Sequence, residues 1–306
     1  MPEVRARMWI FSELFSNYTV AVVVCGAIFL GLTAGACGTV VFVRKETLLA
    51  DAVSHGCLPG IALGFMVAQG KSPSMLLVGA LLTAFVTVGF VRLARSVSAV
   101  RFDSALAMGV SISFGVGIVL LTAIQSSGAS GQAGLDRFLF GQASAMSLDD
   151  VKTIFIMGAV CALSLAVFWK HIKIVCFDRE YAESSGFSVR AVGFFLNAFL
   201  VAATVIGIET VGVVLMCSMM VAPAIAARHL TDTMGKMTVL AALIGAVGGV
   251  LGVIGSWKID NLPTGPAIVV CVTVAALAAI LFSPKNGILA RRARFESAGV
   301  ENEPRS

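Results

Sequence analysis

Charged residues are scarce in this chain: Asp, Glu, Lys and Arg make up only 13% of its 306 residues, whereas a typical soluble domain carries about 25%. Hydrophobic residues make up 58%, and the mean hydropathy is +0.95. This scarcity of charge excludes a soluble globular domain. We therefore expect a multi-pass membrane protein, built as an all-α bundle of transmembrane helices.

Other features are missing as well. No signal-peptide pattern precedes the first apolar segment, which is too long and has no cleavage site. The sequence contains no repeat of fixed period and no low-complexity linker. We expect one transmembrane domain over 18–283, preceded by an interfacial segment over 1–17 and followed by a polar cytoplasmic tail over 284–306.

The apolar segments set the number of predicted spans. A span requires about 17–25 mostly apolar residues. Two of the segments are separated only by Glu209, so they form either two spans joined by a tight turn or one span joined to a half-helix. The sequence therefore predicts eight to nine spans, from the segments 18–43, 47–69, 74–91, 104–125, 153–169, 191–208, 210–228, 237–257 and 262–283.

Lys and Arg fall mainly on one side of the predicted bundle. If the loop after the first segment is cytoplasmic and the sides alternate, the opposite loops hold only Lys71, Arg137, Lys152 and Lys258. By the positive-inside rule, this bias places the C-terminus inside the cell. It also accounts for most of the net charge of +5, so nucleic acid is not an expected partner. The side of the N-terminus stays open.

The seven cysteines lie mostly within the apolar segments, at no spacing typical of a metal site or a disulfide framework. Free cysteine behaves as a small apolar residue in a protein interior. We therefore interpret the cysteines as packing residues.

One apolar segment contains an unusual pair of ionisable residues. Asp51 and His55 lie four residues apart, so on a helix their side chains share one face. An Asp at the centre of a membrane helix costs roughly 2.5–3.5 kcal/mol, and such residues usually mark a transport pathway. Carboxylate and imidazole both bind divalent transition metals. Asp51 and His55 are the candidate metal ligands, and the alternative is a structural pair satisfied by neighbouring helices.

Glycine and proline surround His55 in the same segment. Gly56, Gly60 and Gly64 recur every four residues on the opposite stripe of the helix, a pattern that lets membrane helices pack closely. Pro59 has no backbone N–H, so the carbonyl of His55 loses its helical partner and a kink is expected there.

Two side chains are too few to hold a transition metal, which usually has about four or more ligands. Two copies of the segment meeting at a two-fold axis would supply two Asp and two His side chains. This count of ligands predicts a dimer, in which the second chain is either an identical copy or a related paralogue.

The most charged stretch between two apolar segments is F-D-R-E-Y-A-E-S-S-G-F-S-V-R at 177–190. A short helix over about 178–185, ended by Gly186, fits the rules for helix termination. The stretch is either a docking element for a cytoplasmic partner or an ordinary solvated loop.

The long outer loop 126–152 contains L-F-G at 139–141. Loops of this length are uncommon unless they are functional. The loop is either a short re-entrant helix or docking surface, or a loosely packed connection without a role.

Motifs for catalysis are absent. G-K-S at 70–72 lacks the earlier glycine of a phosphate-binding loop, because position 65 is Phe65. Ser54 adjoins His55, but neighbours on a helix point about 100° apart and cannot form a nucleophile–base pair. H-E-x-x-H does not occur either. We therefore expect a transport protein rather than an enzyme.

Five stretches of the sequence carry a resemblance to a known family. They are D-A-V-S-H-G-C-L-P-G-I-A-L-G at 51–64, L-F-G followed by S-L-D-D, F-D-R-E-Y-A-E-S-S-G at 177–186, V-G-V-V-L-M-C-S-M-M-V-A-P-A-I-A-A-R at 211–228 and L-P-T-G-P at 262–266. In this order, they are similar to the permease subunit of the zinc/manganese/iron uptake class of ABC transporters. The resemblance extends over about 18–283.

The resemblance implies an importer-type ABC permease in the inner (plasma) membrane. Such a protein passes Mn, Zn or Fe ions by alternating access, here through Asp51 and His55, and holds no permanently bound cofactor. ATP hydrolysis belongs to separate cytoplasmic ATPase subunits, and an extracytoplasmic metal-binding protein delivers the ion.

The resemblance also implies that 177–190 contains a coupling helix that docks into the ATPase. The residues that match it are Asp178, Arg179, Glu180, Ala182 and Gly186. An ion-coupled secondary metal transporter that works without an ATPase is the alternative, because it too would place ionisable residues near the membrane midplane.

Overall fold

The computed structural model describes residues 18–68, 70, 72–127, 141, 143, 146–259, 262–283 and 287. Within these ranges the chain forms ten α-helices and no strand, which confirms the all-α prediction. The helices are α2 Tyr18–Val43, α3 Thr47–Ala68, α4 Pro73–Val97, α5 Phe102–Ser126, α7 Leu148–Phe177, α8 Arg179–Ser184, α9 Val189–Val211, α10 Val213–Leu230, α11 Met234–Lys258 and α12 Thr264–Phe282. The segment 1–17, nearly all of the tail and the L-F pair of the outer loop lie outside the described residues.

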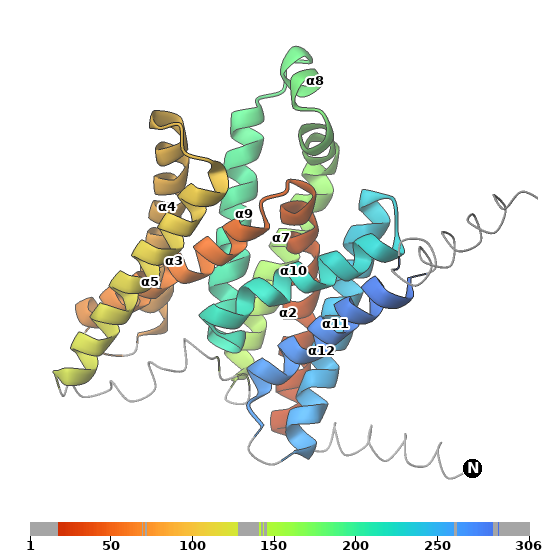
Figure 1. The fold of residues 1–306 in the computed structure, drawn as a ribbon. Helices are drawn as coiled ribbons and strands as arrows, with labels where there is room; N and C mark the ends of the chain where they lie inside the picture. The colour runs from red at the N-terminus through yellow and green to blue at the C-terminus, as the bar shows by residue number, and fades with distance from the viewer. Residues whose placement is uncertain are drawn as a thin grey trace, which may run out of the picture.

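Eight helices of the described ranges are long and apolar enough to cross a membrane, and α10 is a further, shorter apolar helix. The two segments next to Glu209 form separate helices, but the break lies at Gly212, whose φ is +92°. Glycine adopts this backbone conformation without a steric penalty. The chain therefore turns sharply there, and α10 is inclined against α9 (Figure 1).

The connections predicted to be cytoplasmic lie at one end of the bundle. In Figure 1 the α2–α3, α4–α5 and α10–α11 connections lie toward the end that carries α8. The distribution of Lys and Arg predicts this alternation of sides. We therefore refer to the α8 end of the bundle as the cytoplasmic end.

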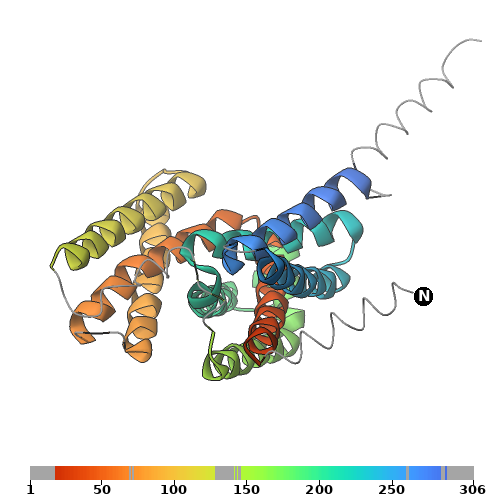
Figure 2. The same ribbon diagram turned by 90° about the horizontal axis from the view of Figure 1, so that it is seen from below.

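Two groups of helices meet along α3. On one side α3 packs against α4 and α5, and on the other it contacts α9 and α10 (Figure 2). In the second group, α2 packs against α7, α10 and α11. Among the apolar windows of the spans, 78% of the α3 window is buried, compared with 22% for α5 and for α7. α3 is therefore the most enclosed span, and it remains helical through Pro59.

Close contacts between helices depend on glycine. A side chain at Gly60 would collide with the carbonyl oxygen of Gly79 in α4, and one at Gly56 would lie 2.7 Å from Thr87 Oγ1. α2 and α11 approach in the same way, because Gly31 faces the backbone of Gly245. These contacts confirm the small-residue packing predicted for the glycine stripe of α3.

Hydroxyl groups inside the spans bond mostly within their own helix. Ser54 Oγ donates to the Ala50 carbonyl at 2.9 Å, and Thr204 Oγ1 donates to the Leu200 carbonyl at 2.8 Å. The hydroxyls of Thr87 and Ser113 lie 3.0 Å apart and link α4 to α5. These bonds allow the spans to carry small polar groups without unpaired donors in the membrane.

Replacing Gly60 by alanine is expected to destabilise the protein, because the added methyl group would force α3 away from the Gly79 carbonyl. Overpacking of this kind costs about 1–3 kcal/mol. The matched control is Gly89→Ala in α4, where nothing lies within 4 Å of the added carbon and alanine is the better helix former by about 1 kcal/mol. Thermal unfolding in detergent should show a lower melting temperature for Gly60→Ala alone. Equal shifts for both variants would contradict the glycine contact.

Candidate functional site

α3 places the two candidate metal ligands side by side. His55 Nε2 lies 3.5 Å from Asp51 Oδ1, and the side chains are 14% and 33% exposed, respectively. Their neighbours Ala52, Val53 and Ser54 are fully buried. The pair therefore lies on an incompletely covered face of an otherwise enclosed helix, as the four-residue spacing predicted.

Packing holds the imidazole of His55 in place. Its ring meets the ring of Phe114 in α5 edge to face, with centroids 5.1 Å apart and an interplanar angle of 84°. The second ring nitrogen, Nδ1, is buried and makes no hydrogen bond with the residues that the structure describes. The ring is therefore held against Phe114, and its Nδ1 has no hydrogen-bond partner in the described part of the chain.

α10 packs against α3, the helix that carries the pair. In the described part of the chain, no three His, Cys, Asp or Glu side chains gather closely enough to hold a metal ion. The assignment of Asp51 and His55 as metal ligands, and of a second chain that completes the site, stays a prediction.

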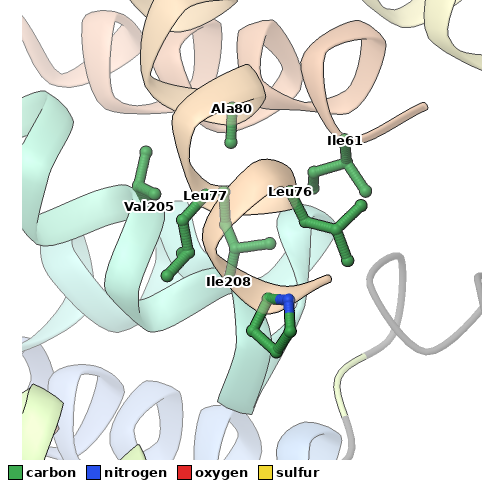
Figure 3. Close-up of a pocket in the computed structure, with 7 residues that line it drawn as sticks. Ile61, Leu76, Leu77, Ala80, Val205 and Ile208 are labelled. Atoms are coloured by element: carbon green, nitrogen blue, oxygen red, sulfur yellow. The ribbon is translucent and has the colours of Figure 1, made fainter. Parts of the chain in front are cut away.

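Toward the outer end of the bundle, apolar side chains replace the polar pair. Leu58 is buried against Gly117 of α5. Beyond it lies a small pocket between α3, α4 and α9, with room for about one water molecule, lined by Ile61, Pro73, Leu76, Leu77, Ala80, Val205 and Ile208 (Figure 3). Its hydrocarbon walls contain no metal ligand, so this pocket is not a second ion site.

The predicted coupling stretch forms the short helix α8. Asp178 caps its first turn, because its side chain accepts a hydrogen bond from the Tyr181 backbone N–H at 2.8 Å. Gly186 has a φ of +80°, and the Phe187 N–H donates to the Ala182 carbonyl at 3.0 Å. The predicted helix and its termination at glycine are both confirmed.

α8 is attached to the bundle by one face. Ala182 is fully buried, and the ring of Phe187 packs against His171 of α7, with centroids 5.1 Å apart. Arg179 and Glu183 form an exposed ion pair at 3.3 Å. The buried Ala182 therefore marks the inner face of α8, and Arg179 and Glu183 mark an exposed, charged outer face.

Comparison with known proteins places the chain in a family. The sequence model of the ABC 3 transport family matches residues 16–283. The chain belongs to the ABC 3 transport family. It is 39% identical over 277 residues to the zinc transport system membrane protein TroC of Treponema pallidum. The aligned region covers 90% of this chain and 93% of TroC. It is also 38% identical to the manganese transport system membrane protein MntC of Bacillus subtilis. That aligned region covers 89% of this chain and 63% of MntC.

Solved structures support the same assignment. The fold is similar to that of PsaBC from Streptococcus pneumoniae in complex with Fab, with a TM-score of 0.81 and 26% identity over 94% of this chain and 98% of that one. The prediction of an importer-type ABC permease fold is confirmed. The relatives are membrane proteins of transport systems, which confirms a transport permease rather than an enzyme, located in the inner membrane with several spans.

Exposure along α3 predicts how fast introduced thiols react with a water-soluble reagent. In a variant whose own cysteines are replaced, Asp51→Cys and His55→Cys should react much faster than Leu58→Cys, because position 58 is covered by α5. Mass spectrometry of the labelled chain after timed exposure measures the rates. Equal rates at the three positions would show that the polar pair is as enclosed as Leu58.

Proposed function

We propose that this chain is the membrane-spanning permease of an ATP-driven importer of a divalent transition-metal ion, Mn²⁺, Zn²⁺ or Fe²⁺. The observation that carries the proposal is the Asp51–His55 pair, 3.5 Å apart in the most enclosed span. The names of the relatives support this class of cargo, because they transport zinc, manganese or, for the 30% identical YfeC of Yersinia pestis, chelated iron.

The chemistry of the pair suits a cation that has lost part of its water shell. The Asp51 carboxylate offsets positive charge, and a neutral His55 imidazole supplies a nitrogen ligand. Because about four ligands are needed, a second permease chain contributes its own pair, whether that chain is identical or a paralogue. The ion enters from an extracytoplasmic metal-binding protein and leaves on the cytoplasmic side by alternating access.

The proposed link to ATP is α8. Its charged outer face docks into a cytoplasmic ATPase subunit, and its buried Ala182 holds it against the bundle. α8 lies between α7 and α9 in the chain, and α9 contacts α3. Movement of the ATPase pair can therefore reach the helix that carries Asp51 and His55.

Uptake of metal into proteoliposomes tests the site. With the ATPase, the binding protein and ATP present, Asp51→Ala and His55→Ala should each abolish uptake of the transported ion, while the complex still assembles. Ser54→Ala is the matched control, because Ser54 lies between the two on a buried face and bonds only within its own helix. Uptake by both site variants at the wild-type rate would refute the metal pathway.

The same preparation separates the two transport mechanisms. Uptake that requires the ATPase and ATP supports the importer. Uptake by the chain alone, driven by a proton or ion gradient, would instead establish the secondary transporter.

Substitution of Ala182 by glutamate tests the coupling helix. The new carboxylate has no room or partner at a fully buried position, so α8 should be displaced and the ATPase should no longer co-purify or support uptake. Ser184→Ala is the control, since the exposed Ser184 hydroxyl bonds only to the Tyr181 carbonyl of its own helix. Normal co-purification of the ATPase with Ala182→Glu, together with normal uptake, would remove α8 from the coupling path.

A further inference from the structure

An aromatic side chain of α5 lies against one of the two candidate metal ligands. Phe114 meets the His55 imidazole edge to face, with the ring centroids 5.1 Å apart and the ring planes at 84°. Aromatic rings attract each other in this orientation at centroid distances of about 4.5–7 Å. Phe114 is 38% exposed and lies outside the buried core. Filling of the core therefore does not explain why an aromatic ring stands beside His55.

The register of α5 against its neighbours fixes the level at which this ring lies. Directly before Phe114, the Ser113 hydroxyl oxygen lies 3.0 Å from Thr87 Oγ1 of α4. Three residues after Phe114, Gly117 leaves room for the side chain of Leu58 in α3, because a carbon added at Gly117 would lie 2.6 Å from Leu58 Cδ2. These two contacts lie on either side of Phe114 along α5, so they hold its ring at the level of the metal pair.

The two ring nitrogens of His55 have different surroundings. Nε2 lies 3.5 Å from Asp51 Oδ1. Nδ1 is buried and makes no hydrogen bond with the described residues. The second side-chain torsion of histidine has roughly two-fold preferences, and a half turn about it would exchange Nε2 with a ring carbon. A metal ion shared by the carboxylate and the imidazole therefore requires one of the two ring orientations.

We propose that Phe114 is a positioning residue for the metal pair, because its ring holds the His55 imidazole in the orientation that places Nε2 beside Asp51. This role rests on the proposed function, since Phe114 acts on the transported ion only through His55. The phenyl ring supplies no ligand atom. It raises the affinity for the ion by restricting a rotation that binding would otherwise have to stop, as outer partners of metal-binding histidines do.

Chemical modification of histidine tests the positioning without a metal ion. Diethyl pyrocarbonate acylates imidazole nitrogen, and mass spectrometry gives the rate at each of the three histidines of the chain in the complex with the ATPase. Phe114→Leu keeps an apolar side chain but removes the ring, so His55 should react faster. His171 and His229 should keep their wild-type rates, because they lie in α7 and α10, whereas a general loss of structure would change all three rates.

Binding of Co²⁺ to the same complex without ATP tests the consequence for the ion. Co²⁺ accepts carboxylate and imidazole ligands, and its visible absorption measures the bound fraction. Phe114→Leu should raise the dissociation constant about two- to tenfold, the factor expected from the loss of one aromatic pair. The number of ions bound at saturation should stay the same. Phe114→Tyr keeps the ring and should have the wild-type affinity.

Phe85→Leu is the matched control. Phe85 of α4 stacks on Phe194 of α9, with ring centroids 6.4 Å apart and an interplanar angle of 23°. This variant therefore loses an aromatic pair between two helices without touching the pair at His55. Both the rate of His55 modification and the affinity for Co²⁺ should be those of the wild type.

The outcomes separate the positioning role from the proposed function. If Co²⁺ does not bind to the wild type, or binds equally well to Asp51→Ala and His55→Ala, the proposed metal pathway fails and the positioning role fails with it. If those two variants lose binding, then a wild-type affinity or a wild-type His55 rate in Phe114→Leu refutes the positioning role alone. Equal effects of Phe114→Leu and Phe85→Leu refute it as well. If Phe114→Leu does not give a monodisperse complex, Phe114→Met takes its place with the same expected results.

Discussion

The cost of placing unpaired polar groups in hydrocarbon is the constraint on which this structure depends. Backbone groups avoid that cost by forming helices, and hydroxyl groups avoid it by bonding to carbonyls of their own helix, as Ser54 and Thr204 do. Against this background, Asp51 and His55 are exceptional, because an ionisable pair is retained in the most enclosed span. The energetic cost of the pair is the physical argument for a function at that place.

The rest of the architecture fixes the position of this pair. Glycine lets α4 approach α3 from one side through Gly60 and Gly79, and Phe114 of α5 packs against the His55 ring. Farther out, Leu58 and the apolar pocket offer no ligand to an ion. Side chains on a helix held this closely are better positioned than side chains on a loop, which suits the metal binding proposed for Asp51 and His55.

Much of the fold and the adjacency of Asp51 and His55 were predictable, because the relevant signals are local in the chain. Runs of apolar residues located the spans, and the bias of Lys and Arg set the sides. The charged stretch ending in Gly186 correctly predicted α8. The break between α9 and α10 was expected at Glu209, because a charged residue interrupts an apolar run. The structure has the break at Gly212, because the sharp turn requires a positive φ, which glycine adopts without a steric penalty.

The sequence by itself therefore determined the membrane class, the helical spans and the adjacency of Asp51 and His55, since these follow from hydropathy, charge and the period of the α-helix. Only the tertiary structure decided which residues of different helices meet. It brought Phe114 of α5 against the His55 ring and Thr33 of α2 against Gly158 of α7. Such contacts depend on how closely two helices approach and at what angle they cross. Small residues such as Gly158 set that distance, and the helices they bring together are remote from each other in the chain.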